Sequence, residues 1–438
     1  MKQQRKRLIA GLMFGLLLVC LLCGCEKTSS QNIVLGDVTQ NDHSAYESEL
    51  TFFGFKYEAL NVMAIEEALH GFMNLHPEIN IAYDGIKSPE YFEVLEKRLL
   101  TGNGDDIIMV DQERTHELNA KGLLADLSDI CDLSKFSDLA RSQMTADGNI
   151  VYLPTSISAF GFYCNLDMLE THGQKVPENL KELAAVCDYF VSQGITPIVA
   201  NNDISLKTVA LAVGLLPYYQ EEDPVAAIER FNTGEDDLAE ALLPGFELVE
   251  RMLKEGWVDR DEAIETAKTS EDLDIFAAGN RPFMLTGVWA VPRVRDLEPE
   301  FDFTVVPYPI LEDGSVLVIN IDTRLSVPAD SPHVEEAKAF VKYIIQKEVM
   351  WEFVDSQCSF SPLEDNRLSK DDDIQSINPY LTNGRCIIGS DDNLRLPIWS
   401  VSRSCIGTIL EGGDAKSAVA CLKEMVAADL VQKGGNGA

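Results

Sequence analysis

Short apolar stretches alternate with helical periods from residue 50 onward, and this alternation constrains the fold more than any other feature of the chain. Residues 50–55 are typical of a strand, and apolar side chains then recur at helical spacing over residues 60–73. A second pair of this kind follows at residues 79–83 and 91–100. Residues 107–110 form a continuous apolar run, which indicates a strand buried on both faces.

This pattern predicts an α/β fold with a mostly parallel sheet covered by helices. Ligands bind such sheets beyond the carboxyl ends of the strands. The loops that follow Phe55 and Val110 are therefore candidate parts of a binding site.

Two extended, proline-containing segments divide the chain. Residues 149–154 end in a proline and precede a new apolar run at 160–164, and residues 303–309 contain two further prolines. We expect both segments to cross between two lobes, because 438 residues are enough for two domains that each bury a core. Such crossovers would form a hinge around a cleft that a bound ligand closes.

The chain after the first crossover is predicted to be mainly helical. Pro177 is suited to open a helix over residues 177–189, and apolar side chains recur at helical spacing in 238–253 and 273–278. Residues 399–432 predict two helices separated by a pair of glycines. The second lobe should therefore be the larger one.

The N-terminus has the charged-then-apolar order of an export signal. Basic residues precede the apolar stretch 8–22, which is short for a permanent membrane span. These basic residues are Lys2, Arg5, Lys6 and Arg7. The letters LCGC at 22–25 resemble a bacterial lipoprotein box, which implies a signal peptide over residues 1–24 and a lipid anchor at Cys25. Ordinary cleavage and secretion is the alternative.

Residues 25–47 are predicted to be the lipidated N-terminus and a flexible tether, because they are polar and lack hydrophobic periodicity. The formal net charge of −35 opposes binding to nucleic acid and to anionic lipid head groups. The lipid would therefore have to hold the protein at the membrane. An acidic surface can also steer cationic ligands, although a solubilising face is the more common reason for such charge.

The cysteines and acidic clusters predict no metal site and no cofactor. The seven cysteines after Cys25 include no C-x-x-C pair, and because seven is odd at least one thiol must stay unpaired. The acidic runs 371–373 and 391–392 lack the ligand spacing of a calcium loop, so we expect them to lie in solvated loops.

Five blocks in a fixed order resemble the family 1 extracellular solute-binding proteins of ATP-driven importers, which include the maltose-binding proteins. The blocks are FMNLHPEI at 72–79, GDDII at 104–108 with GLLADL at 122–127, YLP at 152–154 with YCN at 163–165, FMLTGVW at 283–289, and VEEAKAF at 334–340. The second block is the most specific. In the third, Cys164 separates a tyrosine and an asparagine that are usually adjacent in the family.

This resemblance implies a two-lobed fold of the periplasmic-binding-protein type II class, with a cleft between the lobes and no catalysis. The first lobe would comprise residues 48–154 and about 310–356, and the second residues 155–309 and about 357–438. The implied partners are a small ligand, expected to be a sugar or oligosaccharide, and the permease subunits of an ABC importer. A monomer on the extracytoplasmic face of the cell membrane is expected.

Aromatic rings that can stack on sugar faces are the first candidates for the site. Trp289 lies just after Gly287 at a strand-to-helix turn, and the alternative is a core tryptophan. Trp399 opens a helix and resembles the family's C-terminal cleft aromatic. Phe55 and Tyr57 follow the first strand.

Polar groups after the third strand are the second set of candidates. The resemblance places Glu113 where relatives have a hydroxyl-binding carboxylate, with Arg114 expected to orient it. Asp111 is also a candidate, although the backbone dipole at a helix N-terminus explains Asp111 well and Glu113 less well. Ser158 matches a position that is often larger and polar in the family.

Two other functions remain open at this point. A surface glycosidase would need two carboxyl groups roughly 5–9.5 Å apart around a glycosidic bond, and no such pair stands out in the sequence. A receptor for polyamines or other cations would suit the acid excess, since aromatic boxes bind cations as well as sugars.

Overall fold

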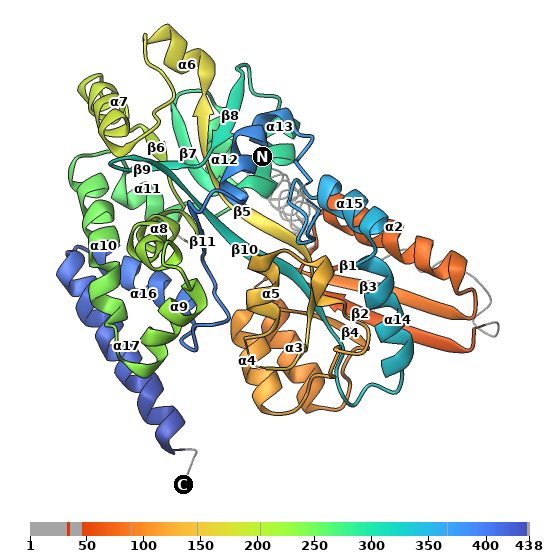
Figure 1. Cartoon of the computed structure of the whole chain (residues 1–438). Coiled ribbons are helices and arrows are strands. Elements are labelled where there is room, and N and C mark those ends of the chain that lie inside the picture. Colours follow the sequence, from red (N-terminus) through yellow and green to blue (C-terminus); the bar gives the residue numbers. More distant parts are fainter. Residues whose placement is uncertain are drawn as a thin grey trace, which may run out of the picture.

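A computed structural model of the chain describes residues 33–35 and 46–435, apart from residues 89, 147, 202 and 366. The predicted signal peptide and Cys25 lie outside the described residues. The described strands form one curled sheet in the order β1-β3-β2-β4-β10-β5-β7-β6, with β8, β9 and β11 paired to its long central strands. Figure 1 shows how helices cover this sheet on either side of those strands.

The first lobe is built on parallel strands, as the sequence predicts. The register joins β2 (Ser48–Gly54) to both β3 (Ile79–Ile86) and β4 (Ile107–Val110). The predicted helices between these strands are confirmed as α2 (Ala59–Leu75) and α3 (Glu90–Leu100). The lobe also contains α4 (Gln112–Ala120), the 3₁₀ helix η1 (Leu133–Lys135), α5 (Asp138–Met144), α14 (Val334–Ile344) and α15 (Lys347–Ser356).

The segment predicted as a tether contains a short strand. Residues Ile33–Leu35 form β1, which pairs antiparallel with the end of β3. The prediction that no part of residues 25–47 belongs to the fold is therefore wrong for this stretch, where an apolar Ile-Val-Leu run meets the free edge of β3.

Two long antiparallel strands connect the lobes, so the sheet is more mixed than predicted. The 13-residue strands β5 (Leu153–Asn165) and β10 (Gly314–Ser326) pair with each other over most of their length. The expected break between the crossover and the apolar run at 160–164 is absent, because β5 continues through the polar Thr155 and Ser156, whose hydroxyls bond to Thr323. The short strands β8 (Phe303–Val306), β9 (Tyr308–Leu311) and β11 (Cys386–Ile388) line these two strands.

The second lobe is mainly helical around the parallel strands β6 (Ile198–Val199) and β7 (Phe283–Gly287). The helix expected from Pro177 begins later, because the Asn179 side chain caps the backbone N–H of Glu182. The helices are α6 (Leu166–Thr171), α7 (Leu180–Ser192), α8 (Ser205–Tyr219), α9 (Pro224–Thr233), α10 (Leu238–Lys254), α11 (Arg260–Glu265), α12 (Glu271–Ala277), η2 (Val288–Ala290), α13 (Val291–Asp296), η3 (Asp372–Leu381), α16 (Ile398–Leu410) and α17 (Ala415–Gly435).

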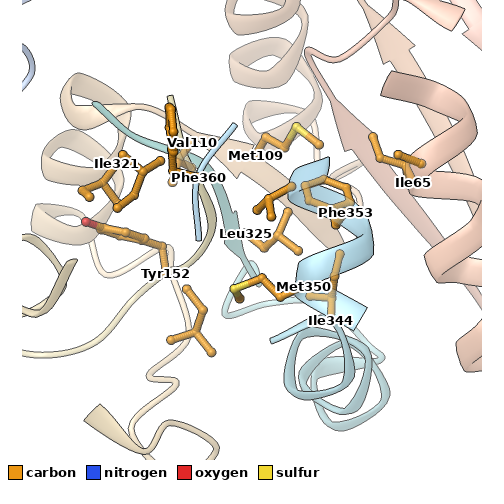
Figure 2. Close-up of a cluster of buried hydrophobic side chains, with 14 of the residues drawn as sticks. Ile65, Met109, Val110, Tyr152, Ile321, Leu325, Ile344, Met350, Phe353 and Phe360 are labelled. Atoms are coloured by element: carbon orange, nitrogen blue, oxygen red, sulfur yellow. The ribbon is translucent and has the colours of Figure 1, made fainter. Parts of the chain in front are cut away.

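Two hydrophobic cores lie on either side of the long strands. One gathers side chains of β2, β3 and β4 with α2, α14 and α15 and extends to α12 and α13, and the other gathers α8, α10, α16 and α17. Figure 2 shows part of the first core, where Met109 and Leu325 from the sheet lie beside Met350 and Phe353 of α15. Two cores of this kind make the chain a two-lobed α/β protein, while the predicted residue boundaries of the lobes stay a prediction.

The acidic pair at 391–392 is buried, which contradicts the expectation of a solvated loop. Asp392 accepts hydrogen bonds from Arg324 Nη1 at 2.6 Å and from Tyr152 Oη at 2.5 Å. Asp391 accepts from Gln143 Nε2 at 2.8 Å and from the Tyr219 hydroxyl. Burial raises the pKa of Asp392, and Arg324 and Tyr152 act against that rise. The carboxylates are buried because dedicated partners replace the water that they lose.

The seven cysteines of the described body are all free thiols. No helix among the described residues is long and apolar enough to span a membrane.

Candidate ligand-binding site

The carboxyl ends of two pairs of parallel strands bring the candidate residues to two facing edges. On the first lobe, β2 leads into the loop of Phe55 and Tyr57, and β4 leads into Asp111 and Glu113. On the second lobe, β6 leads into Asn201 and Asp203, and β7 leads into Trp289. Ligands bind at this end of strands in open α/β sheets.

Trp289 is half-buried and folds back over the turn that precedes it. A Cβ atom at Gly287 would lie 2.2 Å from Cζ2 of the Trp289 ring, so only glycine leaves room for this position. The ring also meets Phe160 edge-on, with centroids 5.3 Å apart.

Trp399 reaches the same phenylalanine from another part of the chain. It lies in the first turn of α16, and its ring is 5.2 Å from that of Phe160. Phe160 is opposite Gly287 in the β5–β7 register and opposite Val318 in the β5–β10 register, which explains why both indoles meet it. We call Phe160, Trp289 and Trp399 the aromatic wall. The structure thus brings the two predicted tryptophans together.

Lys207 lies behind the aromatic wall, and the sequence analysis missed it. Its side chain is 1% exposed, and its Nζ lies 4.0 Å from the Trp399 ring centroid and donates to Asp203 Oδ1 at 3.0 Å. Burial lowers the pKa of Lys207 to about 8, against the opposing effect of Asp203. The available signal was an Asp-Lys pair four residues apart at the start of the otherwise apolar α8.

Asp203 is the centre of a group of charges at this edge. The Asn201 side chain shapes the loop by accepting from the backbone N–H groups of Asp203 and Ile204, at 3.1 and 2.7 Å. Lys268 pairs with Asp203 Oδ2, and Arg403 Nε lies 3.6 Å from Oδ1. Burial raises the pKa of Asp203, but Lys207 and Lys268 outweigh it and hold the pKa well below its usual value.

A cavity of about 200 Å³ opens beside this charge group and runs along α16. Lys207 and Arg403 line it together with Leu206, Ile264 and Ile406. Because Lys207 also contacts Trp399, the cavity lies next to the aromatic wall, although neither tryptophan lines it.

On the first lobe, Glu113 is exposed and faces α16. The Ser400 hydroxyl donates to Glu113 Oε2 at 3.2 Å, which links the two edges. The expectation that Arg114 orients Glu113 is wrong, since its Nη1 pairs with Glu117 Oε2 at 2.5 Å one turn further along α4. Asp111 accepts from the Arg114 backbone N–H at 2.8 Å and so caps α4.

The loop after β2 contributes a mixture of aromatic and charged side chains. Phe55 packs against Tyr91 and Phe92, with ring centroids 5.6 and 5.9 Å apart. Burial raises the pKa of the half-buried Tyr57, and the neighbouring Glu58 raises it further. Glu58 pairs with Arg293 Nη1 of α13 at 3.4 Å, which is a second contact between the edges.

Ser158 is buried in β5 opposite Asn320 of β10. It lies two residues before Phe160 on the same face of the strand. Among the described residues, no group of three or more His, Cys, Asp or Glu side chains is arranged to hold a metal ion.

Two α/β lobes joined by long strands, with aromatic and polar side chains at facing strand ends, define the class of hinged binding proteins. The family model of the bacterial extracellular solute-binding proteins matches residues 56–351 of this chain. The chain therefore belongs to that family.

Several relatives carry the comparison further. The multiple sugar-binding protein of Streptococcus mutans is 20% identical over 344 residues, covering 76% of this chain and 79% of its own. RafE solved in complex with raffinose is 21% identical, with a TM-score of 0.67 over 86% of this chain and 98% of its own. A sugar transporter of Bacillus licheniformis, solved in complex with stachyose, is 19% identical, with a TM-score of 0.65 over 86% of this chain and 98% of its own. The two structural likenesses confirm the two-lobed fold.

Proposed function

We propose that this protein captures a sugar or oligosaccharide between its lobes and delivers it to the permease of an ABC importer. The aromatic wall carries this proposal, because two half-buried indoles from distant segments converge at the strand ends where a ligand binds. Indole faces suit the apolar C–H faces of sugars. The family and the sugar-binding relatives support the same ligand class.

Binding would proceed by closure of the two edges on the ligand. Glu113 would accept hydrogen bonds from sugar hydroxyls opposite the aromatic wall, with the Phe55–Tyr57 loop at one end of the site. The Ser400–Glu113 and Glu58–Arg293 contacts would strengthen the closed arrangement. A ligand shifts this equilibrium only by as much as it binds the closed state better than the open one.

The proposal includes a lipid anchor at Cys25, a monomeric protein and an extracytoplasmic location. The lipoprotein-like LCGC sequence supports the anchor, and membership of an extracellular binding family supports the location. It also includes the absence of catalysis, which is supported by the fact that the relatives are binding proteins. The buried Lys207 cation beside Trp399 argues against a polyamine, because like charges repel in this setting.

Thermal unfolding and calorimetry with a panel of mono- and oligosaccharides test the proposal, with polyamines and amino acids as controls. A selective rise in Tm with a saccharide is expected, since ligand that binds only the folded state stabilises it. Trp289→Ala and Trp399→Ala should each weaken binding by roughly 10- to 100-fold, which corresponds to the loss of about 1.5–3 kcal/mol of ring contact.

Trp351→Ala on α15 is the matched control, because this indole bonds to Asp365 in the first lobe away from the aromatic wall. It should lower Tm without changing affinity. A Tm rise with polyamines alone, or turnover of any oligosaccharide, would contradict the proposal.

A further inference from the structure

The charge beside the aromatic wall is opposite in sign to that of the whole chain. The chain has a formal net charge of −35, yet Asp203 is surrounded by the three cations Lys207, Lys268 and Arg403. Together with Glu411, which lines the same cavity, two carboxylates face these three cations, so this small region keeps a formal excess of one positive charge.

The exposure of these cations increases from the core toward the cavity. The side chains of Lys207, Lys268 and Arg403 are 1%, 38% and 57% exposed. Asp203 is 12% exposed and also lines the cavity, but Lys207 and Lys268 pair with it, so the more exposed Arg403 is the cation that an incoming ligand would meet.

Arg403 is also incompletely paired. Its Nε lies 3.6 Å from Asp203, which is longer than a hydrogen bond, and it has no hydrogen-bond partner among the residues that the structure describes. A guanidinium has five N–H donors in a planar fork that matches a carboxylate, and here that fork lines the cavity.

Two of these cations connect the cavity to the stacking surface. Lys207 touches Trp399 on one side and lines the cavity on the other, and Arg403 is one turn after Trp399 on α16. A ring stacked on Trp399 would therefore direct a substituent along α16 toward Arg403. The remaining lining is largely apolar, with Glu411 at the far end of α16.

We propose that the protein prefers acidic saccharides, in which the carboxylate of a uronic-acid unit enters this cavity and bonds to Arg403 while the sugar ring lies on Trp399. Lys268, which pairs with Asp203 beside the cavity, would keep the Asp203 carboxylate neutralised. The inference rests on the proposed function, because it assigns a ligand class to the same site. Lys207 would hold Asp203 in place and add to the positive potential.

Calorimetry with matched pairs of saccharides separates this inference from the proposed function. The probes are trigalacturonate and a glucuronate-containing trisaccharide, each against its neutral methyl ester, with raffinose and stachyose as further neutral sugars. At least one acid should bind about tenfold tighter than its ester, the size expected for one charge-assisted hydrogen bond. The preference should shrink as salt is raised.

Variants of the exposed cations locate the effect. The double variant Lys268→Gln with Arg403→Gln should abolish the preference for the acid while leaving the affinity for its ester unchanged, and Arg403→Lys should restore part of it. Lys254→Gln is the charge-matched control, since this 70% exposed lysine pairs with Glu250 on α10. The Tm of each unliganded variant verifies that it is folded.

Three results would count against the inference. Equal or tighter binding of the neutral sugars would overturn it and leave the proposed function standing. A preference for the acid that survives the double variant would place the carboxylate elsewhere and would also overturn it. Binding of none of the saccharides would contradict the proposed function, and the inference with it.

Discussion

Two largely buried carboxylates in this molecule, Asp392 and Asp203, each pair with cations, but the two groups differ in exposure and in the role we infer for them. Around Asp392, the carboxylate and Arg324 are each 2% exposed, and the pair is completed by Tyr152. Around Asp203, one carboxylate meets cations of graded exposure, and the outermost cation lines a cavity. The first group ties the 391–392 segment to the long strands, and the second leaves binding capacity directed at the cavity. Exposure therefore distinguishes a structural ion pair from a candidate recognition site.

The largest expected effect comes from breaking the buried Arg324–Asp392 pair. Arg324→Leu leaves Asp392 buried without its counter-ion, which should lower the free energy of unfolding by about 3–5 kcal/mol. Urea denaturation measures this loss.

The matched control is Arg385→Leu, whose partner Asp313 is 72% exposed. That exposed pair should cost less than about 1 kcal/mol. Equal losses in the two variants would show that the Asp392 group is no more structural than a surface pair.

A smaller effect is expected from displacing a ring of the aromatic wall without removing it. In Gly287→Ala the new methyl group would overlap the Trp289 ring, while the backbone φ of −74° is acceptable for alanine. Saccharide affinity should fall about tenfold, or about 1.4 kcal/mol, as measured by calorimetry.

The Tm of Gly287→Ala should change little. Gly104→Ala is its control, because there the nearest atom is the flexible end of Leu99 at 3.3 Å. Unchanged affinity in Gly287→Ala would mean that the position of the Trp289 ring is not used in binding.

The group around Asp203 should tolerate loss of its buried cation better than the group around Asp392 does. In Lys207→Met, Asp203 keeps Lys268 and Arg403, and an apolar side chain replaces a desolvated amine. We expect a smaller loss in the free energy of unfolding than in Arg324→Leu, because Asp203 keeps two other cations, whereas Asp392 loses its counter-ion. A loss as large as that of Arg324→Leu would remove the distinction between the two groups.

The smallest expected effect is a pH dependence of binding to an acidic saccharide. Burial lowers the pKa of Lys207 to about 8, whereas Asp203 stays ionised over this range. Lys207 is a cation below pH 8 and loses its charge as pH rises through that value. Affinity for an acidic saccharide should therefore fall a few-fold between pH 7 and pH 9.

Calorimetry at the two pH values with the acid and its methyl ester measures this change. The methyl ester is uncharged at this position, so its affinity should be the same at both pH values. The pH dependence should also disappear in Lys207→Met, and its persistence there would assign it to another group.

Much of the first lobe could be predicted from the sequence, because its strands and helices have clear apolar periods. The strands at 50–55, 79–83 and 107–110 and the paired helices after residue 398 are confirmed. The long antiparallel strand β5 could not be foreseen in full, since its polar middle reads as a break until Thr323 is known to satisfy it.

Only part of the candidate site could be predicted from the sequence. Trp289 and Trp399 could be proposed singly from their local turns, but their meeting at Phe160 depends on the order of strands in the sheet. Asp391 and Asp392 were misjudged as solvated because their partners lie far away in the chain. Lys207 was missed because a lone lysine in an apolar helix shows no sign of its burial.

The central claim is that a saccharide binds against the aromatic wall between the two lobes. A crystal structure with the saccharide that binds tightest in the panel tests it most directly. We predict a sugar ring in contact with Trp289 or Trp399 and a hydroxyl within hydrogen-bonding distance of Glu113. A saccharide bound away from both indoles, or an aromatic wall still covered by protein in the complex, would contradict the account.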